Sequence, residues 1–136
     1  MTHHVSSMLE TYPKELGNID QQKLAECIEA CFECAQTCTA CADACLAEDM
    51  VADLRQCIRL NLDCADVCAA TGAVLSRQTG VNVETTRALL EACRAACKMC
   101  GDECASHADM HEHCRVCAEA CRRCEQACAE LLATLG

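Results

Sequence analysis

Apolar positions recur along this chain at alternating steps of three and four residues, in four long segments that short polar breaks separate. This spacing keeps the repeated positions on one face of a helix with 3.6 residues per turn. The repeated positions are mostly cysteine, while Ala, Glu, Arg, Gln and Asp fill the other faces. The pattern therefore predicts four amphipathic helices whose apolar faces meet in a core made largely of sulfur.

The cysteines form one stripe in each segment, and all 18 cysteines of the chain belong to a stripe. The second stripe is sparser than the others. In chain order, the stripes are Cys27, Cys31, Cys34, Cys38, Cys41 and Cys45; then Cys57, Cys64 and Cys68; then Cys93, Cys97, Cys100 and Cys104; then Cys114, Cys117, Cys121, Cys124 and Cys128.

Turn and capping residues divide the first half of the chain. Residues 3–16 have an amphipathic pattern that Gly17 ends, and Asn18 or Asp20 can cap the helix that follows. That helix is expected to continue to about residue 47, where a tight turn over residues 48–50 leads into the next.

The second half has equally short connections. The second long helix is expected to end near residue 78, before the Thr79-Gly80 break. Asn82 caps a third helix to about residue 107, and a turn over residues 108–111 leads to a fourth that ends near residue 135. We expect two parts: a short N-terminal helix in residues 1–17 and a cysteine-lined four-helix bundle in residues 18–136.

Composition supports an all-α fold. The chain has one Phe, one Tyr, one Pro and no Trp, which argues against a β-sandwich or barrel and for long uninterrupted helices. Short connections place consecutive helices antiparallel. The prediction is an up-down-up-down four-helix bundle.

Charge and location limit the partners. A formal net charge of −10 and the lack of a Lys/Arg cluster argue against binding to nucleic acid or to an anionic membrane. The N-terminus lacks the basic start and apolar core of a signal peptide, and no apolar run of about 20 residues could span a bilayer. We expect a cytoplasmic protein, whose thiols are kept reduced.

Disulfides fit this pattern poorly. Side chains stacked on one helix face have Cβ atoms roughly 5–6 Å apart, whereas a disulfide requires about 3.8 Å. A cysteine-dense cytosolic chain more often binds metal.

Thiolate is the soft ligand that selects Cu(I), Zn(II) or iron–sulfur clusters. The chain has eight C-x-x-x-C pairs, each placing two sulfurs on one side of a helix, which suits Cu(I) with its two or three ligands. The five C-x-x-C pairs are parts of continuous stripes, unlike the loop knuckles of structural zinc sites. Because buried thiolates need compensation, about eighteen Cu(I) or about nine Zn(II) would balance them.

Other interpretations of the stripes are weaker. The ferredoxin C-x₂-C-x₂-C-x₃-C-P run is absent, and an oxidoreductase would need one reactive thiol on a βαβ scaffold. A core that used cysteine only as a small hydrophobe would leave cavities that cost roughly 24 cal/mol per Å³.

These four cysteine-lined helices, with repeated C-x-x-x-C pairs and His and Met residues at one end, resemble the cytosolic members of the four-helix-bundle copper storage proteins. The resemblance covers residues 18–135. It implies that the protein stores many Cu(I) ions in thiolate clusters to which a core Asn or His contributes, and that it assembles as a homotetramer. The second helix, with three cysteines, departs from the pattern.

The stripes continue into different residues at their two ends. One end gathers Leu24, Thr71, Leu75, Leu90, Leu131 and Leu135 into an apolar plug. The other end carries the candidate metal-binding residues His107, His111, His113, Met50 and Met110, where Cu(I) could be captured and passed inward. His107 and His111 continue a stripe and are candidate ligands, whereas His113 is the one most expected to be solvated.

Two further features bear on function. Asn61 takes the missing step between Cys57 and Cys64, so its side chain should face the sulfur core, either as a Cu(I) ligand or satisfied by the backbone or water. Phe32, Ile58 and Leu62 lie off the stripes and can form an outer face that buries against another subunit.

The leading hypothesis is a non-enzymatic store of about 18–20 Cu(I) ions per chain, because no substrate-shaped site with a placed acid or base is evident. Its expected partners are copper ions, further copies of the chain, and proteins that donate or accept copper. A zinc or general thiol-metal buffer is the alternative, and a copper-dependent enzyme is a third hypothesis.

Overall fold

The computed structural model describes residues 3–135, and its helices follow the predicted order. A short helix, α1 (His3–Glu10), precedes the four long ones: α2 (Gln21–Leu46), α3 (Arg55–Leu75), α4 (Val83–His107) and α5 (Glu112–Thr134). A 3₁₀ turn, η1 (Val51–Leu54), lies between α2 and α3. The all-α prediction is confirmed.

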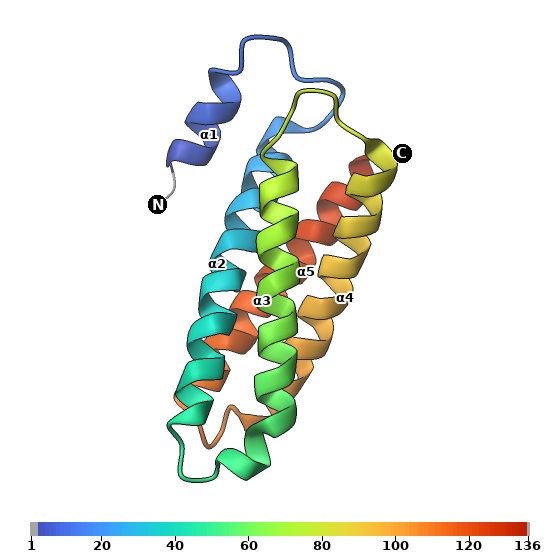
Figure 1. Ribbon diagram of the computed structural model, residues 1–136. Helices are drawn as coiled ribbons and strands as arrows, with labels where there is room; N and C mark the ends of the chain where they lie inside the picture. Colours follow the sequence, from blue (N-terminus) through green and yellow to red (C-terminus); the bar gives the residue numbers. More distant parts are fainter. Residues whose placement is uncertain (1–2, 136) are drawn as a thin grey trace.

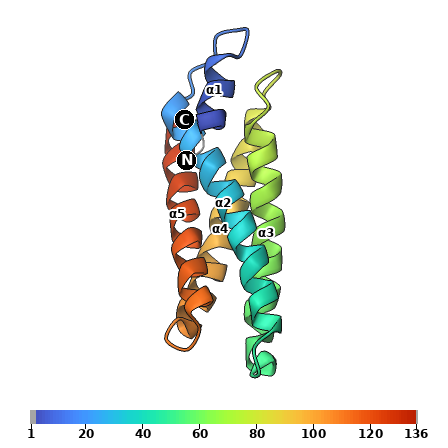
Figure 2. The same cartoon turned by 90° about the vertical axis from the view of Figure 1, so that its left-hand side faces the viewer.

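The long helices form a closed four-helix arrangement (Figures 1 and 2). Each of α2 and α4 packs against both α3 and α5, so the helices surround a central axis. Successive helices run in opposite directions, because the connections between them are short. Helix α1 packs on the outside of α2, toward the end of the bundle where α2 begins and α5 finishes. This is the up-down-up-down bundle that the stripes predict.

Two capping side chains fix where long helices begin. The carboxylate of Asp20 accepts a hydrogen bond from the backbone N–H of Lys23 at 3.0 Å, and the side chain of Asn82 accepts one from Thr85 at 2.9 Å. Each satisfies a backbone donor that has no partner within the helix. Of the two residues that could cap the first long helix, Asp20 is therefore the one that does so.

Three predicted boundaries are wrong. Helix α3 begins at Arg55, after the 3₁₀ turn η1, rather than directly after the turn over residues 48–50. The first helix ends at Glu10 rather than near residue 16. The cause is Pro13, which disfavours helical geometry at the preceding residue. Helix α3 ends at Leu75, a few residues before the predicted end, and the chain turns at Gly80, whose φ of 69° suits glycine.

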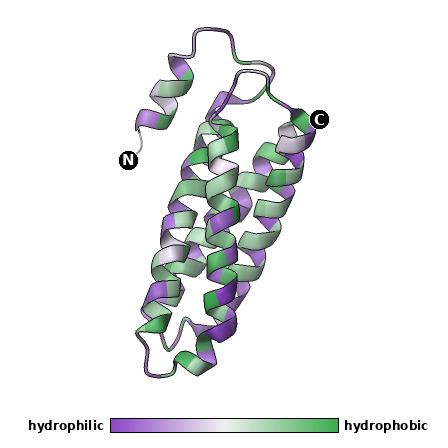
Figure 3. Ribbon diagram, in the orientation of Figure 1, coloured by the Kyte–Doolittle hydropathy of each residue, from purple (hydrophilic) through white to green (hydrophobic). Residues whose placement is uncertain are grey.

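Hydrophobic and hydrophilic bands alternate along each long helix, as amphipathic helices require (Figure 3). The apolar plug forms where predicted: Leu24, Leu90 and Leu131 are fully buried, and Leu75 and Thr71 are buried on α3. Leu135, also expected in the plug, is only partly buried. This end of the bundle is closed by leucine, so the sulfur core is shielded from solvent there. Within residues 3–135, no helix is both long and apolar enough to cross a membrane.

Candidate metal centre

The interior of the bundle is a column of free thiols. All the cysteines are buried and none is more than 2% exposed. Each stripe faces the axis because α2, α3, α4 and α5 all turn their cysteine faces toward one another. The sequence prediction of a sulfur-lined core is therefore confirmed.

Neighbouring sulfurs lie at metal-bridging distances. The Sγ atoms of Cys68 and Cys93 are 3.6 Å apart, and those of Cys38 and Cys121 are 3.7 Å apart. When two sulfurs bind the same metal ion with bonds of about 2.3 Å, they are roughly 3.8 Å apart if the S–metal–S angle is tetrahedral, and up to about 4.6 Å apart if it is linear. The apo thiols thus already stand close to the spacing that a shared ion needs.

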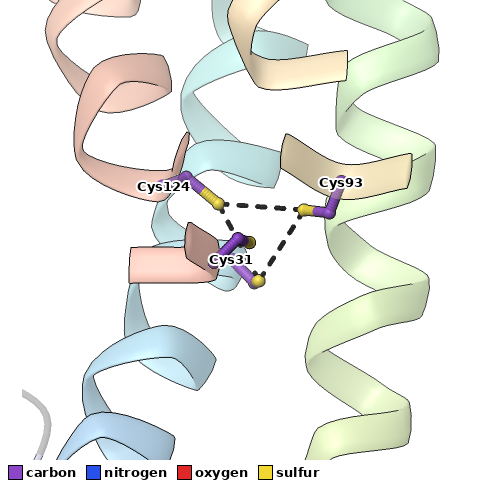
Figure 4. A group of neighbouring side chains, drawn as sticks. Cys31, Cys93 and Cys124 are labelled. Carbon is purple, nitrogen blue, oxygen red and sulfur yellow. Dashed lines mark hydrogen bonds between the residues drawn. The ribbon is translucent and has the colours of Figure 1, made fainter. Parts of the chain in front are cut away.

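The contacts cross between helices at every level of the column. In Figure 4, Cys31 on α2, Cys93 on α4 and Cys124 on α5 form a triangle of sulfurs with sides of 3.8, 3.9 and 4.0 Å. Because each thiol in this triangle contacts two others, one sulfur can bridge two ions.

A series of four compact four-sulfur groups, each overlapping the next, lies among the thiols along the axis. Their ligand atoms all lie within 4.8 Å of one another, and consecutive groups share at least one cysteine. The groups are Cys31, Cys93, Cys124 and Cys128; Cys34, Cys68, Cys97 and Cys124; Cys34, Cys38, Cys64 and Cys121; and Cys38, Cys100, Cys117 and Cys121. Shared members make the column one connected cluster rather than a set of isolated sites.

Burial keeps the thiols of Cys45 and Cys114, near one end of this column, neutral. It raises the pKa of Cys45 to about 11 and also raises the pKa of Cys114. A cation that replaces the proton supplies the compensation that the dry interior lacks, so metal binding and proton release are coupled.

Asn61 lies wholly inside the sulfur core, as its position in the stripe predicts. Its amide nitrogen donates to the backbone carbonyl of Cys57 at 2.8 Å, and its oxygen accepts from the thiols of Cys117 at 2.9 Å and Cys100 at 3.3 Å. The backbone thus holds the nitrogen, while the oxygen faces these two sulfurs and, at 3.9 Å, that of Cys104. These contacts are compatible with both predicted roles of Asn61, as a Cu(I) ligand through its oxygen and as a side chain satisfied by the backbone.

The opposite end from the leucine plug carries the histidines. The Nδ1 atom of His113 lies 3.4 Å from Sγ of Cys41 and 3.6 Å from Sγ of Cys114, and its Nε2 lies 2.8 Å from Glu48. His111 is buried, and its Nδ1 lies 3.1 Å from the same carboxylate oxygen. The structure thus departs from the expectation of a solvated His113, whose ring lies against the thiols.

The remaining candidates lie further out. The ring of His107 bonds Glu103 on its own helix at 2.9 Å. Met50 and Met110 have exposed side chains in the η1 and α4–α5 connections. The structure therefore brings His111 and His113 together and leaves His107 one turn back on α4.

Glu48 is a site residue that the sequence reasoning missed. Glu48 follows Cys45 by three residues, so it continues the stripe of α2. This spacing is the sequence feature from which its position beside the site could have been predicted. Its hydrogen bond from His113 lowers the pKa of the Glu48 carboxyl. Burial lowers the pKa of His113, but the bonds to Cys41 and Glu48 outweigh it and leave that pKa above its usual value.

Comparisons with known proteins agree with this geometry. The family model described as copper storage protein matches residues 20–133. The structure of the copper storage protein Ccsp from Streptomyces lividans, loaded with 10 copper equivalents, is 66% identical over 95% of this chain and 98% of its own, with a TM-score of 0.94.

Two further structures extend the comparison. A cytosolic copper storage protein from the same organism, described as loaded with five coppers, is 69% identical over 82% of this chain and 93% of its own, with a TM-score of 0.81. The Cu(I)-bound copper storage protein BsCsp3, from Bacillus subtilis, is 35% identical over 77% of this chain and 93% of its own, with a TM-score of 0.69. With a family match over most of its length and a core of stacked thiols, this chain belongs to the copper storage protein family.

Proposed function

We propose that this protein is a cytosolic, non-enzymatic store that holds about 18–20 Cu(I) ions per chain in one connected thiolate cluster. The capacity is about one Cu(I) per thiolate, with a small excess held by other ligands. The relatives described as copper-loaded and cytosolic support the ion and the compartment.

The observation that carries this proposal is the continuity of the sulfur column. Eighteen thiolates in a dry interior carry a charge that monovalent ions balance one for one. Divalent ions would balance it with about half as many ions, or would leave an excess of positive charge if they filled every site. Each sulfur with several sulfur neighbours can bridge ions of low coordination number. A Cu(I) cluster therefore fills the column without unpaired charge.

The polar end of the bundle is the proposed route by which copper enters. The leucine plug closes one end, while His107, His111, Met50 and Met110 surround the other with imidazole and thioether groups that bind Cu(I). His113 stands between these groups and the first thiols. We expect His111 and His113 to accept ions from the surface and pass them to Cys41.

A histidine-to-alanine variant at positions 107, 111 and 113 tests this route. It should load Cu(I) more slowly than the unmodified protein, as followed by stopped-flow absorbance under anaerobic conditions. Loading at the same rate would contradict the assignment of this end.

Assembly into a homotetramer is the remaining part of the proposal. Phe32 and Leu62 are exposed apolar side chains on α2 and α3, and Ile58 is only partly buried nearby. Their burial between copies would remove apolar surface from water. Light scattering of purified protein tests this directly: we expect a mass near four chains, and Leu62→Glu should reduce it.

The central experiment is an anaerobic titration of the reduced apo protein with Cu(I) against a chromophoric chelator, with a parallel Zn(II) titration. Tight uptake of about 18–20 Cu(I) per chain is expected from the thiolate count. A plateau at four or five ions, or preference for Zn(II), would favour the zinc-buffer alternative.

A further inference from the structure

One group of ligands differs in composition from the four-sulfur groups of the column. Cys41 and Cys45 from α2 and His113 and Cys114 from α5 place three sulfurs and one nitrogen within 4.8 Å of one another. We call it the mouth site, because His113 and the adjoining Glu48 are partly exposed to solvent there. We propose that the copper-free protein binds one Zn(II) at the mouth site, which incoming Cu(I) displaces.

Three of the ligand–ligand distances of the mouth site match tetrahedral zinc, and Sγ of Cys45 lies within 4.8 Å of the other ligand atoms. With Zn–S bonds of about 2.3 Å and a Zn–N bond of about 2.0–2.1 Å, a tetrahedron has S···N edges of roughly 3.5 Å and S···S edges of roughly 3.8 Å. The corresponding distances are 3.4 Å from Cys41 to His113, 3.6 Å from Cys114 to His113, and 4.0 Å from Cys41 to Cys114. Three cysteines and one histidine are also an established ligand set for zinc.

Charge separates this site from the rest of the column. Zn(II) bound by three thiolates and one neutral imidazole carries one net negative charge, whereas Zn(II) bound by four thiolates carries two. The four-sulfur groups are fully buried, and an uncompensated double charge is costly there. The mouth site is partly open to solvent at His113, so it tolerates its single charge better.

Glu48 prepares His113 for this role. The carboxylate oxygen lies 2.8 Å from Nε2, so Nε2 carries the proton and donates it to the hydrogen bond. The lone pair of the neutral ring is then on Nδ1, which faces Cys41 and Cys114. Carboxylates that orient ligand histidines in this way typically contribute 10–100-fold to metal affinity.

The exchange of ions balances. Zinc binding breaks three S–H bonds, releases three protons to solvent and forms three Zn–S bonds and one Zn–N bond. Cu(I) then takes over the thiolates, because soft sulfur ligands select it, and one Zn(II) leaves without further proton transfer. Until copper arrives, zinc would cover the thiols nearest to solvent.

Anaerobic titration of the reduced apo protein with Co(II) and Zn(II) tests the proposal. Co(II) serves as a probe because its visible absorption reports tetrahedral thiolate ligation. We expect one Zn(II) per chain to remain after desalting, one equivalent of Co(II) to give this absorption, and subsequent Cu(I) to release the zinc. The zinc stoichiometry is measured without copper, so its failure would leave the Cu(I) capacity untouched.

Three variants assign the site. His113→Ala should lose the retained zinc, and Glu48→Gln should weaken zinc binding 10–100-fold. His4→Ala makes the same chemical change on α1, at the other end of the bundle, and should retain one zinc. Circular dichroism of each variant checks that the bundle is intact.

Four outcomes would overturn the proposal: no retained zinc, four or five zinc ions per chain, one tightly bound zinc in His113→Ala, or zinc that stays bound after the protein is filled with Cu(I). The second would show that the interior groups accept divalent ions, against the charge argument.

Discussion

Replacing Cys34 with alanine should lower the Cu(I) capacity more than the same replacement at Cys27. The Sγ atom of Cys34 lies 3.7–4.0 Å from the Sγ atoms of four other cysteines, and Cys34 belongs to two of the four-sulfur groups. The thiol of Cys27 donates to Cys128 at 3.8 Å, at the edge of the column.

The expected magnitudes follow from these contacts. Each variant loses one thiolate, so charge balance alone removes about one Cu(I) from each. In Cys34→Ala, ions in two groups lose a shared ligand, and we expect a loss of about two. Both side chains are fully buried, so each replacement should destabilise the apo bundle by a similar amount, about 1 kcal/mol. The two variants thus differ in the number of sulfur contacts that they remove, while the expected loss in the free energy of unfolding is the same.

The assay is a Cu(I) titration against a chromophoric chelator, with the concentration of apo protein set by thiol counting and its stability by thermal unfolding. A cost of 1 kcal/mol corresponds to a fall in Tm of about 3–5 °C for a domain of this size. Equal losses in the two variants would refute the bridging network, and an unchanged capacity in Cys34→Ala would refute the charge argument as well.

Four further predictions follow from single features of the fold. Leu131→Ala should destabilise the bundle by about 2–5 kcal/mol in guanidinium unfolding and leave the Cu(I) capacity unchanged, since it only opens the apolar plug. Asn61→Ala should change the cluster absorption spectrum if its oxygen binds Cu(I); unchanged capacity and spectra would exclude a ligand role. Gly72→Ala should change the free energy of unfolding by less than about 1 kcal/mol in guanidinium unfolding. The new Cβ would lie 2.9–3.0 Å from the outer end of the half-exposed Phe32 ring, which can shift outward, and alanine has the higher helix propensity; a larger loss would show that this ring is held in place. Removing copper with a chelator should leave the helical circular dichroism intact, whereas its loss would indicate a chain that folds only around metal.

The zinc proposal and the copper store depend on the same principle. The charge that an ion leaves uncompensated decides where it binds: Cu(I) neutralises thiolates one for one and suits the dry column, while Zn(II) suits a site with fewer thiolates and access to water. A single bundle can therefore select two metals by position.

The sequence by itself determined the helices and which residues face inward. A stripe with three- and four-residue steps has a buried face wherever it packs, because the helix period fixes the direction of each side chain. Thus the sequence is enough to place all the cysteines, Asn61 and most of the leucine plug inside the bundle and to identify Asn82 as a cap, whereas it leaves Asn18 and Asp20 as alternatives for the first long helix.

Only the tertiary structure decided which residues meet across helices. His113 lies next to Cys114 in sequence and off the stripe, yet its ring contacts Cys41 on α2 because the α4–α5 turn begins α5 beside the end of α2. Glu48 joins it from the other connection. Helical periodicity gives the face of each side chain but carries no information about the axial shift between helices or the path of the turns, and these set the contacts at the mouth.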